Sequence, residues 1–506
     1  MKHLVLVFCV AIIYAQLLPG HLYGQGQIQE TDPVEFHTGE AVYEAGPDMS
    51  TSRLWHHALL LPNGDVALVG GITTNFVSLG TAEFFNPATN SFASTSMVHT
   101  HASPAVTRLL DGTYLIAGGS ANLGVPRYAV SEIFDPVNLT FTQVGNMARF
   151  RSNAGSAALP DGKVVVAGAW WTHNDANTYG EIYNPETQAF SGIGPFTVSR
   201  STVIVIPTSD GKAMVIGGVS PRGVWDNMPV ELFDPSTGEV TVHQSSLFPD
   251  DEGWTIVNSE TYTEAQKLAD GTYLWMAMKQ LGQAYGFKLV IIDPESMEID
   301  FFETGTGLPD SQAYSFFGQP VIDHENNRAY LVAMVTGAET YQIAVFTVDL
   351  ETGSLTKSSN YHEMTSYKLL SVPTVLLGDG RIFLSGGSVS NNFDAVPHTM
   401  FITPPEPVDV SSMPAAELPG KIILHQNYPN PFNPATLIGY ELPEAGEIRL
   451  EVYDITGKRV AVLFEGYRSP GNYSVPFDAG ELASGIYICR LAAKDQILAL
   501  KMTVMK

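Results

Sequence analysis

The chain has 506 residues, and its 26 basic and 52 acidic side chains give a net charge of −26. This length allows more than one domain, and so negative a surface repels phosphate backbones and anionic lipid, which excludes nucleic acid as an expected partner. Charged residues make up only 15%, while glycine and proline number 46 and 32, a composition typical of many short strands joined by tight turns.

The N-terminus has the features of a secretory signal peptide, which we place at residues 1–24. After a short cationic start, the apolar stretch Leu4–Leu18 is shorter than the ~20 residues that a membrane helix needs, although an uncleaved anchor is the alternative. No later segment is long and apolar enough to span, so we expect no membrane span in the mature chain. Because Cys9 lies inside this signal, Cys489 has no intramolecular disulfide partner, and CxxC zinc sites are excluded.

One pattern then repeats four times between Leu54 and Val242: a turn glycine, a small-residue pair, a glutamate, and Asp or Asn followed by proline. The turn glycines are Gly64, Gly112, Gly162 and Gly211. The glutamates are Glu83, Glu132, Glu181 and Glu231. Both landmarks keep the same stride of 48–50 residues, which indicates one supersecondary unit copied as the blades of a propeller.

Each repeat contains four strand-sized pieces. In the second repeat they are Ala105–Leu110, Tyr114–Ala117, Ser131–Phe134 and Thr140–Gln143, and Asp111-Gly112 turns the first into the second. Weaker copies begin at Leu268, Pro320 and Val372, which brings the predicted number of blades to seven. The last copy lacks a fourth strand, and we expect the N-terminal segment Ala41–Ala45 to complete it and close the ring.

The double glycine, the glutamate and the late aromatic of each repeat resemble the kelch-repeat family over about residues 40–405. The resemblance implies an all-β, seven-bladed kelch-like β-propeller. Two features depart from the family pattern: Gly168-Ala169 lacks the second glycine, and phenylalanine or an aliphatic residue replaces the late tryptophan.

After a linker at residues 406–417, rich in proline, serine, alanine and glutamate, the character of the chain changes. The run from His425 to Thr436, the turn Asp454–Lys458 and the late Ser484–Tyr487 are similar in order and spacing to the C-terminal sorting domain of the type IX secretion pathway, over residues 418–506. The resemblance implies a small Ig-like β-sandwich that binds the type IX secretion machinery and places the protein outside the cell, via the periplasm. An Ig-like module that binds carbohydrate is the alternative.

Alignment of the repeats on their turn glycines gives candidate ligand-binding residues. Eleven residues before each glycine stand Arg53, His101, Arg151, Arg200 and, in the fifth repeat, Glu260. We expect these side chains at the start of the innermost strands, around the mouth of the central channel, where they would suit a polar ligand such as a sugar or a carboxylate. The alternative is that they bond to loop carbonyls and brace adjacent blades.

No metal, cofactor or catalytic residue is predicted. His56, His57 and His99 fall at different registers of the repeat, so they do not form a recurrent metal site. Copper oxidases of the galactose oxidase type, which also carry kelch propellers, place a Tyr-His pair where this chain has Leu370 and Ser371. No cysteine remains for their thioether-linked tyrosine, so this reading is rejected.

We therefore expect a secreted or cell-surface binding or scaffold protein that engages a glycan or protein ligand at one propeller face. The second hypothesis is a secreted carbohydrate-active enzyme, hydrolase or sialidase-like, that uses the arginine-lined channel mouth together with Tyr262 and Glu264. Two carboxylates within about 10 Å of each other beside the arginines would favour the enzyme, because glycoside chemistry needs such a pair.

Overall fold

The computed structural model divides the chain into two compact units, Met1–Pro407 and Val408–Lys506, so the division falls inside the predicted linker. The structure describes residues 35–36, 39–119, 129–169, 178–200, 202–218, 229–245, 265–281, 284–302, 313–316, 320–336, 341–351, 355–364, 372–388, 394–405, 421–427, 430–432, 434–443, 446–468, 471–480, 482–494 and 496–505. The predicted signal peptide, Glu260, Tyr262 and Glu264 lie outside these ranges.

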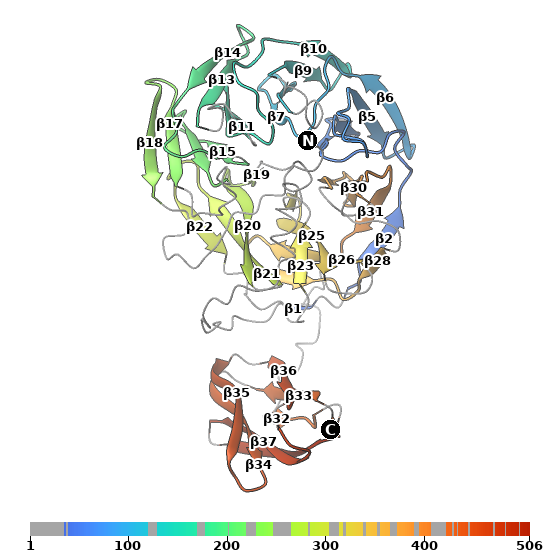
Figure 1. Ribbon diagram of the computed structural model, residues 1–506, viewed down its shortest axis with the longest axis vertical. Coiled ribbons are helices and arrows are strands. Elements are labelled where there is room, and N and C mark those ends of the chain that lie inside the picture. Colours follow the sequence, from blue (N-terminus) through green and yellow to red (C-terminus); the bar gives the residue numbers. More distant parts are fainter. Residues whose placement is uncertain are drawn as a thin grey trace. The chain divides into compact units, whose positions relative to one another are not determined.

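The described residues of the first unit form seven sheets and no helix, and the sheets follow one another around a common centre (Figure 1). Sheet 1 consists of β3 (His57–Leu60), β4 (Val66–Val69), β5 (Thr81–Asn86) and β6 (Ser91–Ser96). Sheet 2 consists of β7 (Ala105–Arg108), β8 (Tyr114–Ala117), β9 (Ser131–Asp135) and β10 (Thr140–Gln143). Sheet 3 consists of β11 (Gly155–Ala158), β12 (Val164–Ala167), β13 (Gly180–Asn184) and β14 (Ala189–Ile193). Sheet 4 consists of β15 (Ile204–Pro207), β16 (Ala213–Ile216), β17 (Val230–Asp234) and β18 (Glu239–Gln244).

The later sheets are less regular. Sheet 5 consists of β19 (Gln266–Lys267), β20 (Tyr273–Leu281), β21 (Ala284–Ile292) and β22 (Ile299–Phe302). Sheet 6 consists of β1 (Glu35–Phe36), β23 (Ala313–Phe316), β24 (Val321–Asp323), β25 (Arg328–Thr336), β26 (Tyr341–Asp349), β27 (Leu355–Lys357) and β28 (His362–Met364). Sheet 7 consists of β29 (Thr374–Leu376), β30 (Ile382–Ser385), β31 (Thr399–Thr403) and β2 (Val42–Ala45).

The N-terminal segment joins the last two sheets. β2 pairs antiparallel with β31, at the place where the sequence predicts the closing strand, and β1 pairs parallel with β27. Between β1 and β2, the Asn360 side chain forms the two hydrogen bonds that a neighbouring strand would form with Ala41. Its Oδ1 accepts the Ala41 amide at 2.9 Å, and its Nδ2 donates to the Ala41 carbonyl at 2.8 Å. Tyr43 stacks on His362 with ring centroids 4.9 Å apart. The N-terminal segment therefore fastens sheet 6 to sheet 7.

The core of this unit lies between neighbouring sheets, because most strands present apolar side chains to the sheet on either side. One cluster joins Val165 and Ala167 of sheet 3 to Val205, Val215 and other residues of sheet 4. Equivalent clusters join sheets 1 and 2, 2 and 3, 4 and 5, 5 and 6, 6 and 7, and 7 and 1. Burial on both faces explains why the second strands, such as Val164–Ala167, read as continuous apolar runs.

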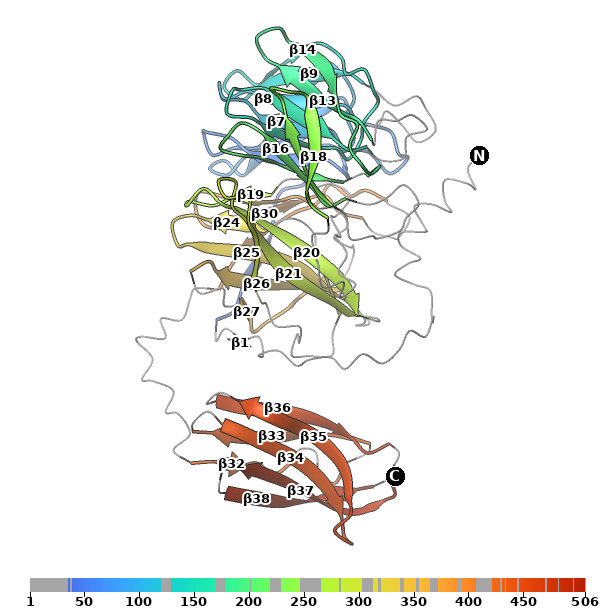
Figure 2. The ribbon, with the colours of Figure 1, turned by 90° about the vertical axis from the view of Figure 1, so that its left-hand side faces the viewer.

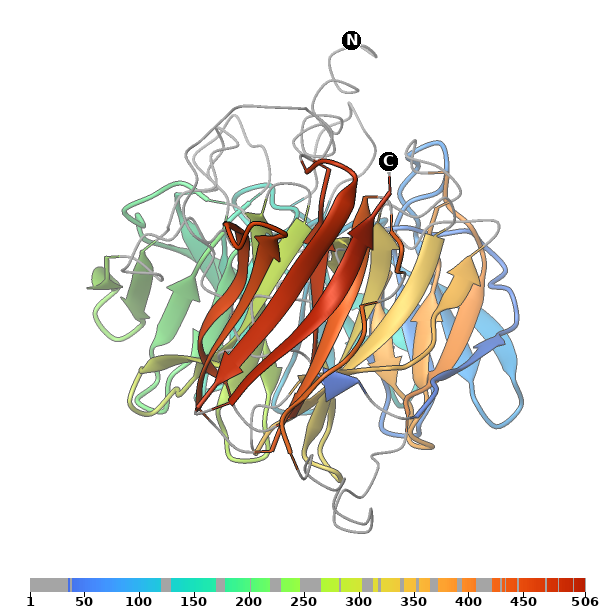
Figure 3. The same ribbon diagram turned by 90° about the horizontal axis from the view of Figure 1, so that it is seen from below.

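The second unit has two sheets. One contains β32 (Ile423–Leu424), β33 (Ala435–Leu442) and β36 (Gly471–Asp478), and the other contains β35 (Arg459–Arg468), β34 (Gly446–Asp454), β37 (Gly485–Ala493) and β38 (Gln496–Val504) (Figure 2). Alternate residues of β37 and β38 enter a single core with Ile438, Leu450 and Phe477. Its long twisted strands can be followed in Figure 3.

The prediction of an all-β chain is confirmed, and the sheets of the first unit are consistent with a β-propeller. The number of blades, their kelch character and the Ig-like type of the second unit stay predictions. No helix that could cross a membrane occurs among the described residues.

Candidate functional site

The four described members of the predicted ligand ring are buried and paired with the recurrent glutamates of their own repeats. Arg53, His101, Arg151 and Arg200 are each no more than 1% exposed. The pairs are Arg53–Glu83 at 2.6 Å, His101–Glu132 at 2.8 Å, Arg151–Glu181 at 3.3 Å, and Arg200–Glu231. Each pair joins the segment before an innermost strand to the third strand of the same sheet.

Each cation also binds the carbonyl of the glycine that ends the second strand. The bonds run from Arg53 to Gly70 at 2.8 Å, from His101 to Gly118 at 2.6 Å, from Arg151 to Gly168 at 3.0 Å and from Arg200 to Gly217 at 3.1 Å. One side chain thus connects three strands of its sheet through its contacts. We call this arrangement of cation, glutamate and glycine carbonyl the clasp.

The glutamate of each clasp also receives backbone amides from the segment that enters the sheet. Glu83 accepts the amides of Ser50 and Thr51, at 2.7 and 3.2 Å, and Glu181 accepts that of Ala148 at 2.6 Å. A carboxylate bound by a cation and by backbone N–H groups can stay ionised in the interior, because these charge-assisted bonds replace its water. For Arg53 the opposing effects are visible: burial lowers the pKa of Arg53, and Glu83 raises it.

His101 takes the place of arginine in sheet 2. Its Nδ1 faces the Gly118 carbonyl and its Nε2 faces the Glu132 carboxylate. His101 therefore makes the same two contacts, to the glycine carbonyl and to the glutamate, as the arginines of the neighbouring sheets.

These contacts match the bracing role, which was the alternative to ligand binding. The buried guanidinium groups already have carboxylate and carbonyl partners, and each pair lies in a different sheet. Ligand binding by Arg53, His101, Arg151 and Arg200 stays an untested prediction, to which this geometry adds no support. Glu260 lies outside the described residues.

The double glycines connect each clasp to the next repeat. Gly71 donates to the backbone carbonyl of His101 at 2.7 Å, and Gly119 donates to that of Arg151 at 2.6 Å. A Cβ at Gly70 would lie 2.4 Å from the His101 carbonyl oxygen, and the φ of Gly70 is +65°. Only glycine fits there, because any side chain would enter the backbone of the neighbouring repeat. Ala169 replaces the second glycine and still donates, to Arg200 at 3.2 Å.

A second repeated feature, which the repeat pattern does not predict, lies two residues after the arginine or histidine of each clasp. Trp55, Ser103, Asn153 and Thr202 all have a left-handed backbone, with φ of 56°, 51°, 52° and 52°. A bulky or β-branched residue is rare in this region, and four equivalent residues there amount to a pattern. None is glycine, so no sequence signal marked these positions.

Backbone hydrogen bonds join these four residues from sheet to sheet. Ser103 donates to the Trp55 carbonyl at 3.1 Å, Asn153 to that of Ser103 at 2.9 Å, and Thr202 to that of Asn153 at 3.0 Å. Each lies two residues before an innermost strand, and β7, β11 and β15 lie on the inner side of their sheets in Figure 1. We call Trp55, Ser103, Asn153 and Thr202 the inner ring.

The inner ring carries an aromatic patch at sheet 1. Half-buried Trp55 packs near Phe76, with ring centroids 6.3 Å apart, and both contact a small cluster that includes Ala102 and Ala395. Asn153 is also partly exposed, whereas Ser103 and Thr202 are buried. The partly accessible members of the ring are therefore Trp55 and Asn153.

Two buried histidines follow Trp55. His56 hydrogen-bonds Ser385 of sheet 7 at 2.9 Å, and His57 hydrogen-bonds the Pro104 carbonyl of the next repeat at 3.0 Å. Burial lowers the pKa of His57 to about 4, and burial followed by the charge of Arg53 holds the pKa of His56 well below its usual range. Both rings are therefore neutral at pH 7 and act as contacts between sheets.

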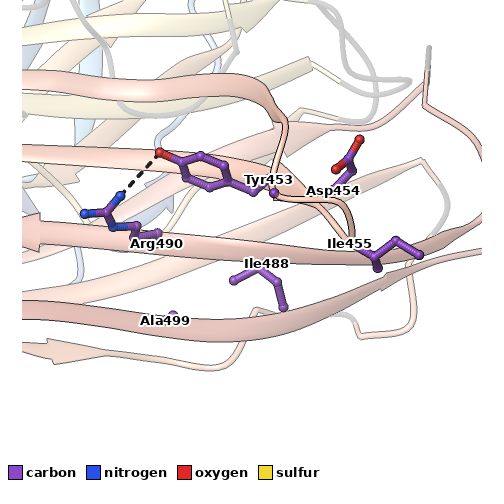
Figure 4. Close-up of a pocket in the computed structure, with 7 residues that line it drawn as sticks. Tyr453, Asp454, Ile455, Ile488, Arg490 and Ala499 are labelled. Carbon is purple, nitrogen blue, oxygen red and sulfur yellow. Dashed lines mark hydrogen bonds between the residues drawn. The ribbon is translucent and has the colours of Figure 1, made fainter.

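No group of three or more potential metal ligands occurs among the residues that the structure describes. Leu370 and Ser371, the positions that would carry the Tyr-His pair of a copper oxidase, lie outside that part of the chain. One surface hollow of about 470 Å³ is formed in the second unit by Tyr453, Asp454, Ile455, Gly457, Ile488, Arg490 and Ala499 (Figure 4).

Comparison with solved structures shows similarity to a fungal alcohol oxidase of the AA5 family, described as novel and solved in complex with copper. The identity is 14% and the TM-score 0.51, over 93% of this chain and 100% of that one. At this identity the similarity supports the propeller-like fold alone. No curated protein matches the chain. Residues 426–505 match the family of secretion system C-terminal sorting domains, which supports export by the type IX pathway to the cell surface or the medium.

Proposed function

We propose that this protein is an exported binding module, in which a seven-bladed, kelch-like propeller engages a glycan at the inner ring. Its signal peptide, residues 1–24, directs it to the periplasm, and the Ig-like sorting domain, residues 418–506, carries it across the outer membrane. The family match over residues 426–505 supports the export half of this proposal.

The observation that carries the binding half is the inner ring. Left-handed backbone at non-glycine residues costs of order 1–3 kcal/mol per residue, and such residues concentrate at ligand clamps. Here four of them occupy the same place in four repeats, beside the innermost strands. Scaffold requirements alone would favour glycine at such positions.

The chemistry of the ring favours an uncharged, hydroxyl-rich ligand. The cations beneath it are neutralised by glutamates, so no free charge of theirs is offered to an anion. The partly exposed members of the ring are Trp55 and Asn153. An indole stacks on the apolar face of a sugar ring, and an amide both donates to and accepts from hydroxyl groups. These are the contacts of a saccharide site.

The test is binding of the purified full chain to a glycan array, followed by calorimetry with the best glycan. We expect Trp55→Ala to abolish binding and Asn153→Ala to weaken it. Phe150→Ala is the matched control, because this residue precedes the third clasp, is 43% exposed and lies outside the ring. The binding proposal fails if the full chain binds no glycan, or if Trp55→Ala binds as tightly as wild type while remaining folded by circular dichroism.

A further inference from the structure

The second unit has one long sheet edge that is only half covered. β38 pairs with β37 along all nine residues without a register shift, and no other strand lies on its far side in the described part of the chain. Strand edges with free N–H and C=O groups are templates for pairing with another chain. How this edge is protected therefore bears on how the unit meets its partners.

One half of the edge is covered by Gln426, Asn430 and Phe432, which belong to the motif at the start of the sorting domain. Gln426 and Asn430 donate to the Lys501 carbonyl at 2.9 and 3.1 Å, and the Asn430 Oδ1 accepts the Thr503 amide at 2.9 Å. Phe432 continues as backbone, with its amide bonded to the Thr503 carbonyl at 3.0 Å. We call the described residues 426–427 and 430–432 the edge cap.

The other half of the edge is open. In an antiparallel ladder, alternate residues turn both backbone groups toward the partner strand or away from it. Lys501 and Thr503 turn theirs away from β37, toward the edge cap, so the unbroken register makes Ala499 and Ile497 turn theirs outward as well. No described residue bonds to those outward groups. Ile497 is 60% exposed and Ala499 is exposed.

The other long edges carry the usual protections. β35 is bulged at two places in its pairing with β34 and contains Arg459 and Arg468, and β36 contains Pro476. Bulges, charges and proline all discourage strand addition. The run Ile497–Leu500 of β38 has none of these devices. Among the described strands of this unit, the open half of β38 is the best template for an added strand.

The face beside the open edge offers side-chain contacts for such a strand. On the neighbouring strand β37, Arg490 pairs with Ala499 and Ile488 pairs with Lys501. Of these four residues, Ala499, Arg490 and Ile488 line the hollow together with Tyr453, whose hydroxyl accepts a hydrogen bond from the Arg490 guanidinium at 3.5 Å (Figure 4). The hollow therefore combines the apolar side chains of Ile488 and Ala499 with one cation, Arg490, and one carboxylate, Asp454.

We propose that the sorting domain is read by strand addition: an extended segment of the export machinery pairs with Ile497–Ala499 of β38. Its apolar side chain covers Ile488 and Ala499, and a carboxylate beside it faces Arg490. The edge cap shows that this edge accepts extended backbone, since Phe432 already forms a parallel bridge to Val504. This inference rests on the proposed export function, and it names the surface that export uses.

The experiment measures the fraction of the full chain that reaches the medium or cell surface in the native host. Ala499→Pro removes one outward N–H and no bond of the ladder, so the fold is retained. Ile497→Lys places a charge on the open half. The control is Ile486→Lys, which adds the same charge to the same sheet face opposite the capped residue Thr503. Ile486 is 44% exposed, which makes the control comparable.

We expect Ala499→Pro and Ile497→Lys to stay folded and protease-resistant but to be retained in the periplasm. The exported fraction of each should be as low as that of a chain that lacks residues 408–506. Ile486→Lys should be exported like wild type. If the deletion blocks export but Ala499→Pro does not, strand addition is wrong and the export function stands. If the deleted chain is exported normally, the export function itself is wrong. A concentration-dependent dimer of the purified full chain that Ala499→Pro abolishes, seen by sedimentation, would make the occupant a second copy and overturn the proposal.

Discussion

The two units of this chain are both all-β, but they treat the edges of their sheets in different ways. In sheets 1 to 4 the outermost strands have only four to six residues, and the clasps fix the segments that lead into the inner strands. The second unit has long strands around one core and leaves part of β38 unpaired. Repeating small sheets around a common centre leaves only short sheet edges exposed. The contrast is that the first unit leaves only short sheet edges, whereas the second leaves part of one long edge open.

The two units also differ in net charge. Residues 1–407 hold 17 of the 26 basic and 41 of the 52 acidic side chains, whereas residues 408–506 hold 9 and 11. Nearly all the net charge of −26 thus lies in the first unit, where it favours solubility. The almost balanced second unit can dock on a protein partner without long-range repulsion.

Removing one clasp should have the largest effect on the stability of the first unit. Arg151→Met leaves the Glu181 carboxylate buried with only backbone amides, and we expect a loss of about 3–5 kcal/mol in the free energy of unfolding. Urea unfolding of the full chain measures it. The exposed pair Lys163–Asp161 of the same sheet is the matched control, and Lys163→Met should cost about 0–1 kcal/mol. If both variants lost the same unfolding free energy, burial would not make the clasp more stabilising than an exposed ion pair.

Acid should weaken the first unit through His57. Its pKa is about 4 in the folded chain against 6.5 for the free side chain, so the unfolded chain binds the proton first. The stability is complete above pH 6.5 and is lost as the pH falls from 6.5 to about 4, by roughly 3 kcal/mol.

The measurement is the unfolding free energy of wild type and His57→Gln across this pH range. The variant should have the shallower pH dependence. The control, His324→Gln, replaces an exposed histidine and should follow wild type. A slope unchanged by His57→Gln would contradict the assignment of His57 as a buried neutral contact.

Much of the first unit follows from local sequence, and the clasps show where that stops. The Asp-Gly turns and the double glycines can be predicted from the sequence, because only certain residues accept their backbone geometry. The recurrence of Arg53 and of Glu83 is equally visible, but nothing in the register says that side chains 30 residues apart meet in the interior. The arginines lie just before the innermost strands, and their burial, which spacing does not reveal, determines what they contact. The left-handed backbone at Trp55 and Thr202 could not be predicted, because neither residue is glycine, the residue that usually marks positive φ in a sequence.

A smaller effect tests the N-terminal closure. Asn360→Ala removes two hydrogen bonds to Ala41 and should cost about 1–3 kcal/mol, with faster amide exchange in β2 than elsewhere. Asn138→Ala is the control, since its side chain bonds only within an exposed turn. Unchanged exchange in β2 after Asn360→Ala would mean that the closing strand does not depend on sheet 6.

The smallest effect concerns the inner ring. Asn153 joins the ring through its backbone N–H and C=O, so Asn153→Gly keeps both bonds and accepts positive φ. We expect a change below about 1 kcal/mol, whereas Asn153→Val should cost more, because a β-branched residue is unfavourable there. Thermal unfolding compares the two. A greater loss with glycine would place the contribution of Asn153 in its side chain.

Residue-resolved amide hydrogen exchange along β38 of the full chain tests the contrast between the units most directly. The outward amides of Ile497 and Ala499 should exchange almost without protection, whereas that of Thr503, held by the edge cap, and those of Gly71 and Gly119, held by the next repeat, should be strongly protected. Protection of Ile497 and Ala499 equal to that of Thr503 would mean that the edge is closed, and would contradict the proposal that β38 is read by strand addition.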